Sequence, residues 1–564
     1  MEIDSIIIGA GPAGLQLAYF LKQRNTPYIL LERSDHVGAF FSQYPRQRQL
    51  ISINKPHSLS VSHDNSLRYD WNTLLCSDGD FKFTNYSDKF YPDASLYVTY
   101  LDDFARKYQL NMKLNTEVSC IKKNARGLFE ITVTGALAYT CRRVFLACGM
   151  AEKSVPEDVQ NASTFVGATL STYGSMTLDP EYYKNRSVVI VGTGNAAFET
   201  ANYLNDFTES IAMVGPSKVA WKTHYPGHLR SKNMAFIDTL YLKMGNIIYF
   251  DDYNAAGVIY TQHTFLKHSG SKLHHVIFCG GFKCQLGFLD VSCRPNMDDR
   301  GFPVLNESFE SSTKNMYFIG ASMQSPDWKI GTSSFIHGFR YNIRFMDRVL
   351  HNDLRPLKFN DRAAVEKYMN MRINESSCLH HRHKWFCDIL VIRMGVGTGV
   401  GVDFCYYEDI YIPYMRANEK YFRSPSDTMV VLYMDYGAEF EWSLKQSGNY
   451  KQPDIIMPFR ESISKFLHPV FEVNFKRECE VTKQVFHVGE SPSGQFHHPI
   501  YQSMINIYLD FAFGNGNQRD IALVECNIIQ LQHDYDDYMK NVTKGNLSPF
   551  VAHKIGTLTT HEIA

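Results

Sequence analysis

Residues 3–32 read IDSIIIGAGPAGLQLAYFLKQRNTPYILLE, and this stretch decides the fold. Its beginning, IDSIII at 3–8, is an apolar run of the kind found in parallel strands that are buried on both faces. Apolar positions at helical spacing follow over 13–24, and a second apolar strand, YILLE, closes the stretch at 28–32. The order strand, glycine turn, helix and strand predicts one βαβ unit.

The turn of this unit carries Gly9, Gly11 and Gly14 at the spacing GxGxxG. In such turns the first glycine allows a tight bend, the second lets the backbone approach a pyrophosphate, and the third lets helix and strand pack closely. The helix N-terminus then binds phosphate, and Glu32 at the end of the second strand accepts hydrogen bonds from a ribose. The predicted ligand is a dinucleotide, and the step from Gly11 to Pro12, which is associated with FAD-binding enzymes, favours FAD.

A second βαβ unit follows later, with the strand SVVIVG, a turn, the helix AAFETANYL and the strand SIAMVG. Gly192, Gly194 and Ala197 give its turn the spacing GxGxxA. The second strand ends without an acid, and Ser217 and Lys218 come soon after it. Because a carboxylate would repel a 2′-phosphate and a lysine would bind it, this segment favours NADPH over NADH. The alternative is a vestigial domain that binds no nucleotide.

Further predicted helices and strands extend these two units into complete domains. Hydrophobic patterns predict a helix over 96–108, strands near 111–115, 117–122, 128–134, 143–148, 274–281 and 315–322, and a helical segment over 334–350. We therefore predict an α/β fold with two nested Rossmann-like domains, one for FAD and one for NADPH, plus a C-terminal α+β region. The predicted ranges are 1–155 with 305–352 for FAD, 156–304 for NAD(P)H, and 353–564 for the C-terminal domain of unknown role.

Composition favours a globular protein and argues against nucleic-acid binding and a membrane span. The chain has 564 residues, 44% of them hydrophobic, which allows sizeable cores. Lys and Arg number 57 against 58 for Asp and Glu, a balance that argues against nucleic acid as a partner. The apolar stretch 389–402 is too short and too mixed to span a bilayer, and no leader peptide precedes the first strand. We expect a soluble, cytoplasmic protein, with the endoplasmic reticulum as the location only if a signal peptide is missing from the sequence.

The twelve cysteines include no CxxC pair. Without a secretory signal, free and mostly buried thiols are expected, including the nearest pair, Cys279 and Cys284. A redox-active disulfide between these two is the alternative.

Several segments resemble the flavin-containing monooxygenases and their N-hydroxylating relatives: LLERSDHVGAFF (30–41), ISINKP (51–56), NTEV (115–118) and GTGNAAFETA (192–201). The resemblance implies two catalytic residues, Asn54 near flavin N5 or the nicotinamide, and Lys55 as a partner for a peroxy charge or the pyrophosphate. A solvated loop lysine is the alternative for Lys55. The monooxygenase fingerprint FxGxxxHxxx(Y/F) is incomplete, because Phe165 and Gly167 are present but Ser171 replaces the histidine.

A closer resemblance covers most of the chain. QYPRQRQLISINK (43–55), RYDWNTLL (68–75), THYPGHLR (223–230), SFIHGFRYNIR (334–344) and FLHPV (466–470) resemble the FAD-dependent oxidoreductase domain-containing flavoproteins of the endoplasmic reticulum. That family is associated with the disposal of misfolded proteins, which implies a role in protein quality control as the alternative function. The chain starts at its first strand and ends in HEIA, so residence in the endoplasmic reticulum is not our expectation.

These resemblances imply further cofactor contacts along the chain. For FAD they are Ala13, Arg33, Phe41, Arg48, Asn54, Val118, Gly149, Gly320 and Ala321, and for NADPH they are Asn195 and Ala196 beside Gly192, Gly194 and Lys218.

The resemblance also implies that the helix at 334–344 points its N-terminus at the flavin pyrimidine ring. Within it, His337 is expected to be a buried histidine with a satisfied hydrogen bond. His380, His381 and His383 form the run HHRH, which we expect to be solvated, and no metal site is predicted.

The favoured hypothesis is a single-component flavin monooxygenase, dependent on FAD and NADPH, that oxidises a small molecule with O₂ through a C4a-(hydro)peroxyflavin. A disulfide or small-molecule reductase and a flavin-stabilised protein-binding module are the alternatives, and homo-oligomerisation is left open.

Overall fold

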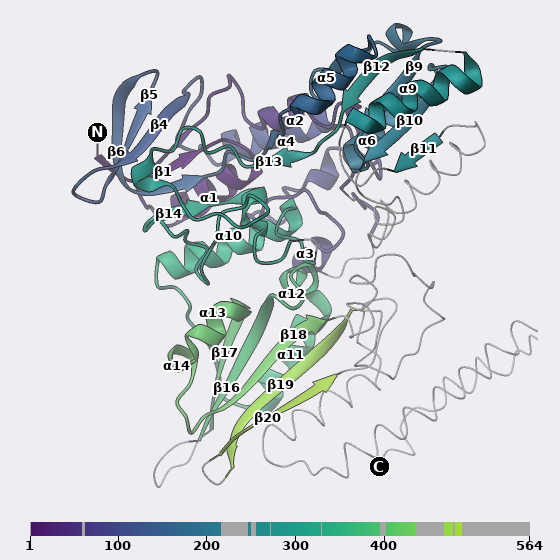
Figure 1. The fold of residues 1–564 in the computed structure, drawn as a ribbon. Helices are drawn as coiled ribbons and strands as arrows, with labels where there is room; N and C mark the ends of the chain where they lie inside the picture. Colours follow the sequence, from purple (N-terminus) through teal and green to yellow (C-terminus); the bar gives the residue numbers. More distant parts are fainter. Residues whose placement is uncertain are drawn as a thin grey trace, which may run out of the picture.

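The computed structural model describes residues 2–52, 54–58, 62–215, 246–249, 255–270, 272–328, 330–394, 402–435, 467–477 and 480–487. Ser217, Lys218 and the segment 223–230 lie outside the described residues. Figure 1 shows three parts: the N-terminal α/β part, a second α/β part beside it, and a C-terminal sheet on the far side of helix α10.

The first sheet has seven strands in the order β3-β2-β1-β6-β5-β4, with β14 also paired to β6. At its centre β1 runs parallel to both β2 and β6, as the first βαβ unit predicts. Its strands are β1 (Glu2–Ile8), β2 (Tyr28–Leu31), β3 (Met112–Lys113), β4 (Val118–Lys123), β5 (Phe129–Val133), β6 (Ala136–Leu146) and β14 (Met316–Phe318). Its helices are α1 (Pro12–Gln23), α2 (Ala39–Gln43), α3 (His63–Ser66), α4 (Ala94–Lys107) and α10 (Ile336–Leu350), with 3₁₀ turns η1 (Phe83–Asn85), η3 (Val291–Cys293) and η4 (Gly320–Gln324).

Strand β6 is longer than predicted, beginning at Ala136 instead of near 143. It forms a hairpin with β5 in which Val133 pairs with Ala136. The two residues between them, Thr134 and Gly135, both adopt left-handed backbone angles, with φ of 48° and 84°. Two successive positive φ values make the turn that matches the twist of adjoining strands, so the chain reverses within two residues.

The second sheet has five strands in the order β11-β10-β9-β12-β8, all parallel. Its strands are β8 (Thr169–Thr172), β9 (Ser187–Val191), β10 (Ser210–Gly215), β11 (Asn246–Tyr249) and β12 (Leu273–Phe278), with helices α5 (Glu157–Phe165), α6 (Asn195–Leu204) and α9 (Ala255–Ser269) and the turn η2 (Pro180–Tyr183). A small antiparallel pair, β7 (Ala151–Glu152) with β13 (Phe282–Lys283), lies between the two sheets in sequence. The second sheet is nested within the first, which confirms the predicted α/β fold, while the domain boundaries themselves stay predictions.

The C-terminal part is a six-stranded antiparallel sheet in the order β15-β17-β16-β18-β19-β20. Its strands are β15 (Leu357–Phe359), β16 (Phe386–Met394), β17 (Val402–Tyr411), β18 (Thr428–Asp435), β19 (His468–Arg477) and β20 (Glu480–His487), with helices α11 (Arg362–Glu375), α12 (Ser377–His381), α13 (Ile412–Ala417) and α14 (Glu419–Phe422). Apolar residues on β16 alternate between two cores: Ile389 and Val391 join the core of the FAD part, whereas Leu390 and Ile392 pack with α11. Both faces of this sheet are therefore buried.

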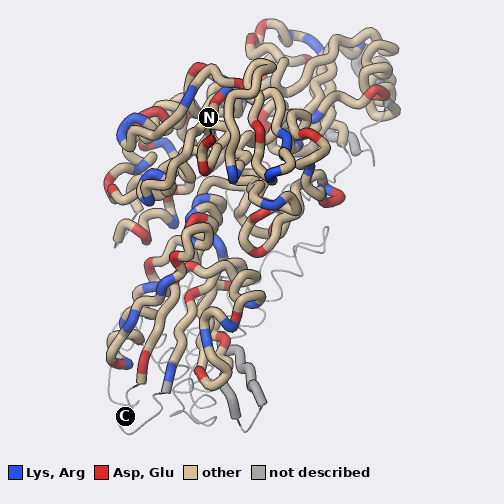
Figure 2. Tube along the Cα trace, turned by 90° about the vertical axis from the view of Figure 1, so that its left-hand side faces the viewer, with Lys and Arg blue, Asp and Glu red and all other residues tan. Residues whose placement is uncertain are grey.

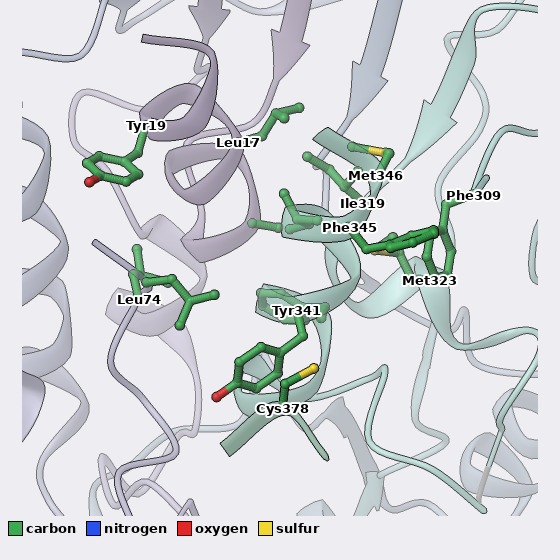
Figure 3. Close-up of a cluster of buried hydrophobic side chains, with 14 of the residues drawn as sticks. Leu17, Tyr19, Leu74, Phe309, Ile319, Met323, Tyr341, Phe345, Met346 and Cys378 are labelled. Carbon is green, nitrogen blue, oxygen red and sulfur yellow. The ribbon is translucent and has the colours of Figure 1, made fainter. Parts of the chain in front are cut away.

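Helix α10 joins the FAD part to the C-terminal part. It contacts α1 on one side and β17 and α12 on the other. Figure 3 shows Leu17 of α1, Tyr341 and Phe345 of α10, and Cys378 of α12 in one apolar cluster. Because the cluster is continuous, the C-terminal part shares a core with the first sheet.

The surface carries both signs of charge. On the side that Figure 2 shows, basic and acidic residues are interspersed along the described trace. Within the part of the chain that the structure describes, no helix is long and apolar enough to cross a membrane.

Candidate functional site

In the first glycine turn, two glycines are required by close packing and one faces open space. Gly9 has a φ of +105°, and a Cβ there would lie 2.5 Å from the carbonyl oxygen of Ala147. A Cβ on Gly14 would lie 1.9 Å from the carbonyl oxygen of Gly9, so both positions require glycine for packing. Gly11 is the N-cap of α1, and a Cβ there would have no neighbour within 4 Å. The backbone at Gly11 therefore faces open space at a helix N-terminus, as a pyrophosphate needs.

Glu32, at the end of β2, is held beside this turn. Its two carboxylate oxygens accept hydrogen bonds from the backbone N–H of Ala10 at 2.7 Å and of Ser34 at 2.9 Å. These bonds fix the carboxylate at the cavity wall, where it can also accept from ribose hydroxyls.

The second glycine turn repeats the same arrangement. Gly192 has a φ of +145°, and a Cβ there would lie 2.4 Å from the carbonyl oxygen of Cys279. Gly194 is the N-cap of α6 and, like Gly11, has no atom within 4 Å of an added Cβ. The two turns thus provide two helix N-termini with free space in front of them.

One cavity of about 1650 Å³ extends from the first turn to the N-terminus of α6. It exceeds the roughly 300–1,000 Å³ of common small-molecule pockets, so it has room for more than one drug-sized molecule. The predicted site residues that line it are Gly9, Gly11, Ala13, Glu32, Arg33, Phe41, Lys55, Val118, Gly149, Asn195, Ala196, Gly320 and Ala321. Gly14, Arg48, Asn54, Gly192 and Gly194 are not part of its lining, and Lys218 lies outside the described residues.

Asn54, predicted to be catalytic, does not line the cavity, and its catalytic role stays a prediction. Its side chain is fully buried, and its amide nitrogen donates to the carbonyl oxygens of Ser87 at 2.6 Å and Lys89 at 3.2 Å. Asn54 therefore holds its own loop to the segment at 87–89. The structure leaves Lys55 as the cavity-lining member of the pair, with its ammonium 5.8 Å from the ring centroid of Tyr69.

Arg48, predicted to contact the cofactor, is also outside the cavity lining, and this contact stays a prediction. It adopts a left-handed φ of 63°, and its guanidinium donates to the carbonyl oxygen of Ser42 at 3.1 Å. Its backbone carbonyl accepts from Ala94 at the start of α4. The residue therefore stabilises the loop before the cavity, and among the described arginines Arg33 and Arg68 are the ones that line the cavity itself.

Part of the cavity is lined by an aromatic wall, which we define as Trp71, Phe335, His337 and His381. The ring centroids of Trp71 and His337 are 4.3 Å apart, and those of His337 and His381 are 4.8 Å apart. His337 is buried as predicted, but the run at 380–383 is not solvated: His380, His381 and His383 all line the cavity. The sequence pattern carries no signal for this, because the contact spans residues from 71 to 381.

Two buried arginines hold the aromatic wall in place. Arg68 donates to the carbonyl oxygens of Ile373 and Ser376, which satisfies the C-terminal end of α11. Arg340 of α10 donates to three carbonyl oxygens of the loop at 67–73, those of Leu67, Asp70 and Thr73. The motif RYDW at 68–71 is thereby fixed between α10 and the C-terminal part.

The cavity lining also contains acidic and aromatic side chains, including Glu199 of α6, the helix that follows the second turn. Tyr173 donates to Glu199 of α6 at 3.1 Å and stacks on Tyr44 with ring centroids 5.6 Å apart. Glu152 accepts from the backbone N–H of Gly174 at 2.6 Å. Burial, together with the negative charge of Glu199, raises the pKa of the Tyr173 phenol, so this hydroxyl stays protonated and remains a donor.

The predicted free thiols are found at Cys279 and Cys284, whose sulfurs contact different partners, Thr200 and Met150. Cys148 lines the cavity. Desolvation there, with the nearby charge of Glu32, raises the pKa of its thiol to about 12. In the described part of the chain, no group of three or more His, Cys, Asp and Glu side chains has metal-binding geometry.

Comparisons with known proteins match this geometry. The model of the family "Pyridine nucleotide-disulphide oxidoreductase" matches residues 6–320. FAD-dependent oxidoreductase domain-containing protein 2 of Mus musculus is 30% identical over 514 residues, which cover 83% of this chain and 75% of that protein. Probable indole-3-pyruvate monooxygenase YUCCA7 of Arabidopsis thaliana is 27% identical over 224 residues, 38% of this chain and 47% of that protein.

Among solved structures, a flavin-containing monooxygenase from Stenotrophomonas maltophilia aligns with a TM-score of 0.46 and 15% identity, covering 62% of this chain and 99% of that chain. The two glycine turns, the cavity between them and the sequence relatives agree on the class of cofactors. The chain belongs to the pyridine nucleotide-disulphide oxidoreductase family, is related to FAD-dependent oxidoreductase domain-containing protein 2, and is an oxidoreductase of FAD and a pyridine nucleotide.

Proposed function

We propose that the protein is an NADPH-dependent flavin monooxygenase that oxidises a small molecule with O₂. The observation that carries the proposal is the single cavity, which begins at the first glycine turn and reaches Asn195 and Ala196 at the N-terminus of α6. Two cofactors bound at these two helix N-termini would share one continuous space, as electron transfer between them requires.

The residues present fit FAD at the first turn. The N-terminus of α1 at Gly11 would hold the pyrophosphate, and Glu32 would accept hydrogen bonds from the adenosine ribose. Gly320 and Ala321, at the start of η4, would approach the cofactor on its flavin side. FAD, when bound, supplies the ability to store two electrons.

The residues at the second turn fit a pyridine nucleotide. Gly194, at the N-terminus of α6, would hold its pyrophosphate, and Asn195 and Ala196 would extend that contact into the cavity. The preference for NADPH over NADH rests on Ser217 and Lys218, which lie outside the described residues.

Oxygen is favoured as the electron acceptor because a dithiol acceptor has little support in the chain. No CxxC pair occurs in the sequence. Among the described residues, Cys148 is the single cysteine in the cavity lining, so the described lining offers no pair of thiols for disulfide exchange. The similarity to an indole-3-pyruvate monooxygenase over 38% of this chain points the same way.

The test measures reduction and reoxidation of the flavin in the purified, FAD-loaded protein. NADPH should bleach the flavin without oxygen, and air should restore its colour. With isotope-labelled O₂ and indole-3-pyruvate, thioether or amine probes, one labelled oxygen atom should enter a product. Rapid reduction of oxidised glutathione without oxygen uptake would instead support the reductase alternative. No bleaching by either nicotinamide would support the protein-binding alternative, and each of these two results would overturn the proposal.

A further inference from the structure

We propose that His381, carried by α12 of the C-terminal part, is the hydrogen-bond acceptor for the N–H of the flavin pyrimidine ring. The inference deepens the proposed function and rests on FAD occupying the cavity. It assigns to the C-terminal part a direct contact with the cofactor.

The direction of the cofactor follows from the cavity. FAD is a linear molecule with its pyrophosphate in the middle and adenosine at one end. With the pyrophosphate at Gly11 and the adenosine ribose at Glu32, the flavin must extend the opposite way, because both halves leave the same pyrophosphate. Gly320, whose added Cβ would lie 2.8 Å from Cβ of Ala13 in α1, and the aromatic wall line the same cavity, and we infer that the flavin reaches them.

The aromatic wall suits a flat ring system. The rings of Phe335 and His337 lie at an interplanar angle of 15° with centroids 5.5 Å apart, and Trp71 lies at 32° to His337. His381 is inclined at 56° to His337, so it borders the stacked rings instead of continuing the stack. A planar ligand against this wall would present its edge to His381.

The tautomer of His381 is determined by its neighbour. Nε2 of His381 lies 3.0 Å from the carbonyl oxygen of Leu67, and a carbonyl can only accept a hydrogen bond. In the neutral ring Nε2 therefore carries the hydrogen, and Nδ1 has a free lone pair for an incoming donor. Arg340 donates to the same Leu67 oxygen at 2.9 Å, which holds that carbonyl in position.

The surroundings keep this imidazole neutral. His381 is 5% exposed. Burial, the neighbouring ring of His337 and the positive charge of Arg340 lower its pKa well below the ordinary value. An unprotonated Nδ1 is therefore available at neutral pH. Oxidised flavin has a single ring N–H, which lies on its pyrimidine edge, so the donor and the acceptor are complementary.

The test compares FAD with FAD methylated at the pyrimidine N–H, by titrating apoprotein and following flavin fluorescence. The unmodified chain should bind the methylated flavin roughly tenfold more weakly, the effect expected for one lost hydrogen bond. His381→Gln keeps a donor near Leu67 but loses the Nδ1 acceptor, so it should bind both flavins about equally. His381→Asn places an amide oxygen near the Nδ1 position and should retain the preference.

His351→Gln is the matched control. His351 lies at the end of α10, where its ring nitrogens contact Thr26 and the carbonyl of Asp347, and it does not line the cavity. This variant should keep the tenfold preference for unmethylated FAD, and melting temperatures would verify that all the variants are folded. Equal binding of both flavins by the unmodified chain would overturn the role of His381 and leave the proposed function standing. Failure to take up any flavin would contradict the cofactor assignment itself.

Discussion

Gly11 and Gly14 stand in the same turn but face different neighbours. Gly11 faces open space, whereas Gly14 touches the backbone of Gly9. We therefore expect Gly11→Val to fold normally and to lose FAD, because its side chain would occupy the place of the pyrophosphate. Gly14→Ala should lower the melting temperature even without FAD, since its Cβ would lie 1.9 Å from a backbone oxygen.

Melting curves of the apoproteins and FAD titrations would separate these two effects. Gly127→Ala is a useful control, because Gly127 has a positive φ of 78° but no atom within 4 Å of an added Cβ, and it does not line the cavity. It should show only modest strain and normal FAD binding. FAD uptake by Gly11→Val at the unmodified affinity would contradict our assignment of the first turn.

Lys218 tests the choice of nicotinamide cofactor. Lys218→Glu would place a negative charge after β10, where we predict the 2′-phosphate of NADPH. We expect KM for NADPH to rise at least tenfold and KM for NADH to change little. Steady-state rates of oxygen uptake with each cofactor would measure both. A parallel rise in both values would indicate a general loss of structure, and an unchanged NADPH preference would refute the assigned role.

At the scale of elements, α11 is anchored to the C-terminal sheet by a buried charge network. Arg372 of α11 donates to Asp388 of β16 at 2.7 and 3.0 Å and to Asp409 of β17 at 2.6 Å. Arg344 of α10 also donates to Asp409, and these cations lower the pKa of that carboxyl to about 2 despite its burial. The network therefore ties one sheet to two helices.

Arg372→Met should leave two buried carboxylates without their main partner. We expect a loss of about 3–5 kcal/mol in the free energy of unfolding of this part, the usual effect of breaking a buried pair from one side. Urea denaturation followed by circular dichroism would measure it. The control is Arg106→Met, which removes an exposed pair with Asp102 and should change little. If both variants unfold alike, the network does not stabilise the sheet.

Because α11 ends at the carbonyls that Arg68 binds, the same variant should also weaken the cavity wall. Loss of stability in the C-terminal part should therefore lower the affinity for FAD, because Arg68 joins the end of α11 to the cavity wall.

At the scale of the molecule, burial of several histidines makes the fold sensitive to acid. Burial lowers the pKa of His275 and of His383 to about 4, and it lowers the pKa of His380 and His381 well below the ordinary value. In the unfolded chain these groups titrate near ~6.5. As pH falls below that value, these histidines become protonated in the unfolded chain but stay neutral in the folded chain. The free energy of unfolding therefore decreases with decreasing pH.

The expected window runs from about pH 6.5 down to about pH 4, with up to ~1.4 kcal/mol lost per pH unit for each such histidine. Melting temperatures between pH 8 and 4.5 would measure the slope, and His381→Gln should reduce it by about one histidine's share. A melting temperature that stays constant from pH 7 to 5 would contradict the prediction. The depressed pKa of Asp409 acts only below about pH 4, so it lies outside this window.

The nucleotide turns could be predicted from the sequence alone. A βαβ unit is local, and Gly9, Gly11, Gly14 and Glu32 are brought together by two strands, one turn and one helix. The same local logic found the second turn at Gly192 and Gly194. These elements were correct to within a few residues, because hydrophobic period and turn chemistry act over short stretches of chain.

Only the tertiary structure decided the other end of the site. Asn54 donates to the backbone at 87–89 and does not line the cavity, whereas the histidines of the run at 380–383 do line it. Both outcomes depend on packing between segments far apart in sequence, such as Leu67 with His381. The local sequence pattern does not predict such contacts, because they depend on the shared apolar core around α10, which joins segments far apart in sequence.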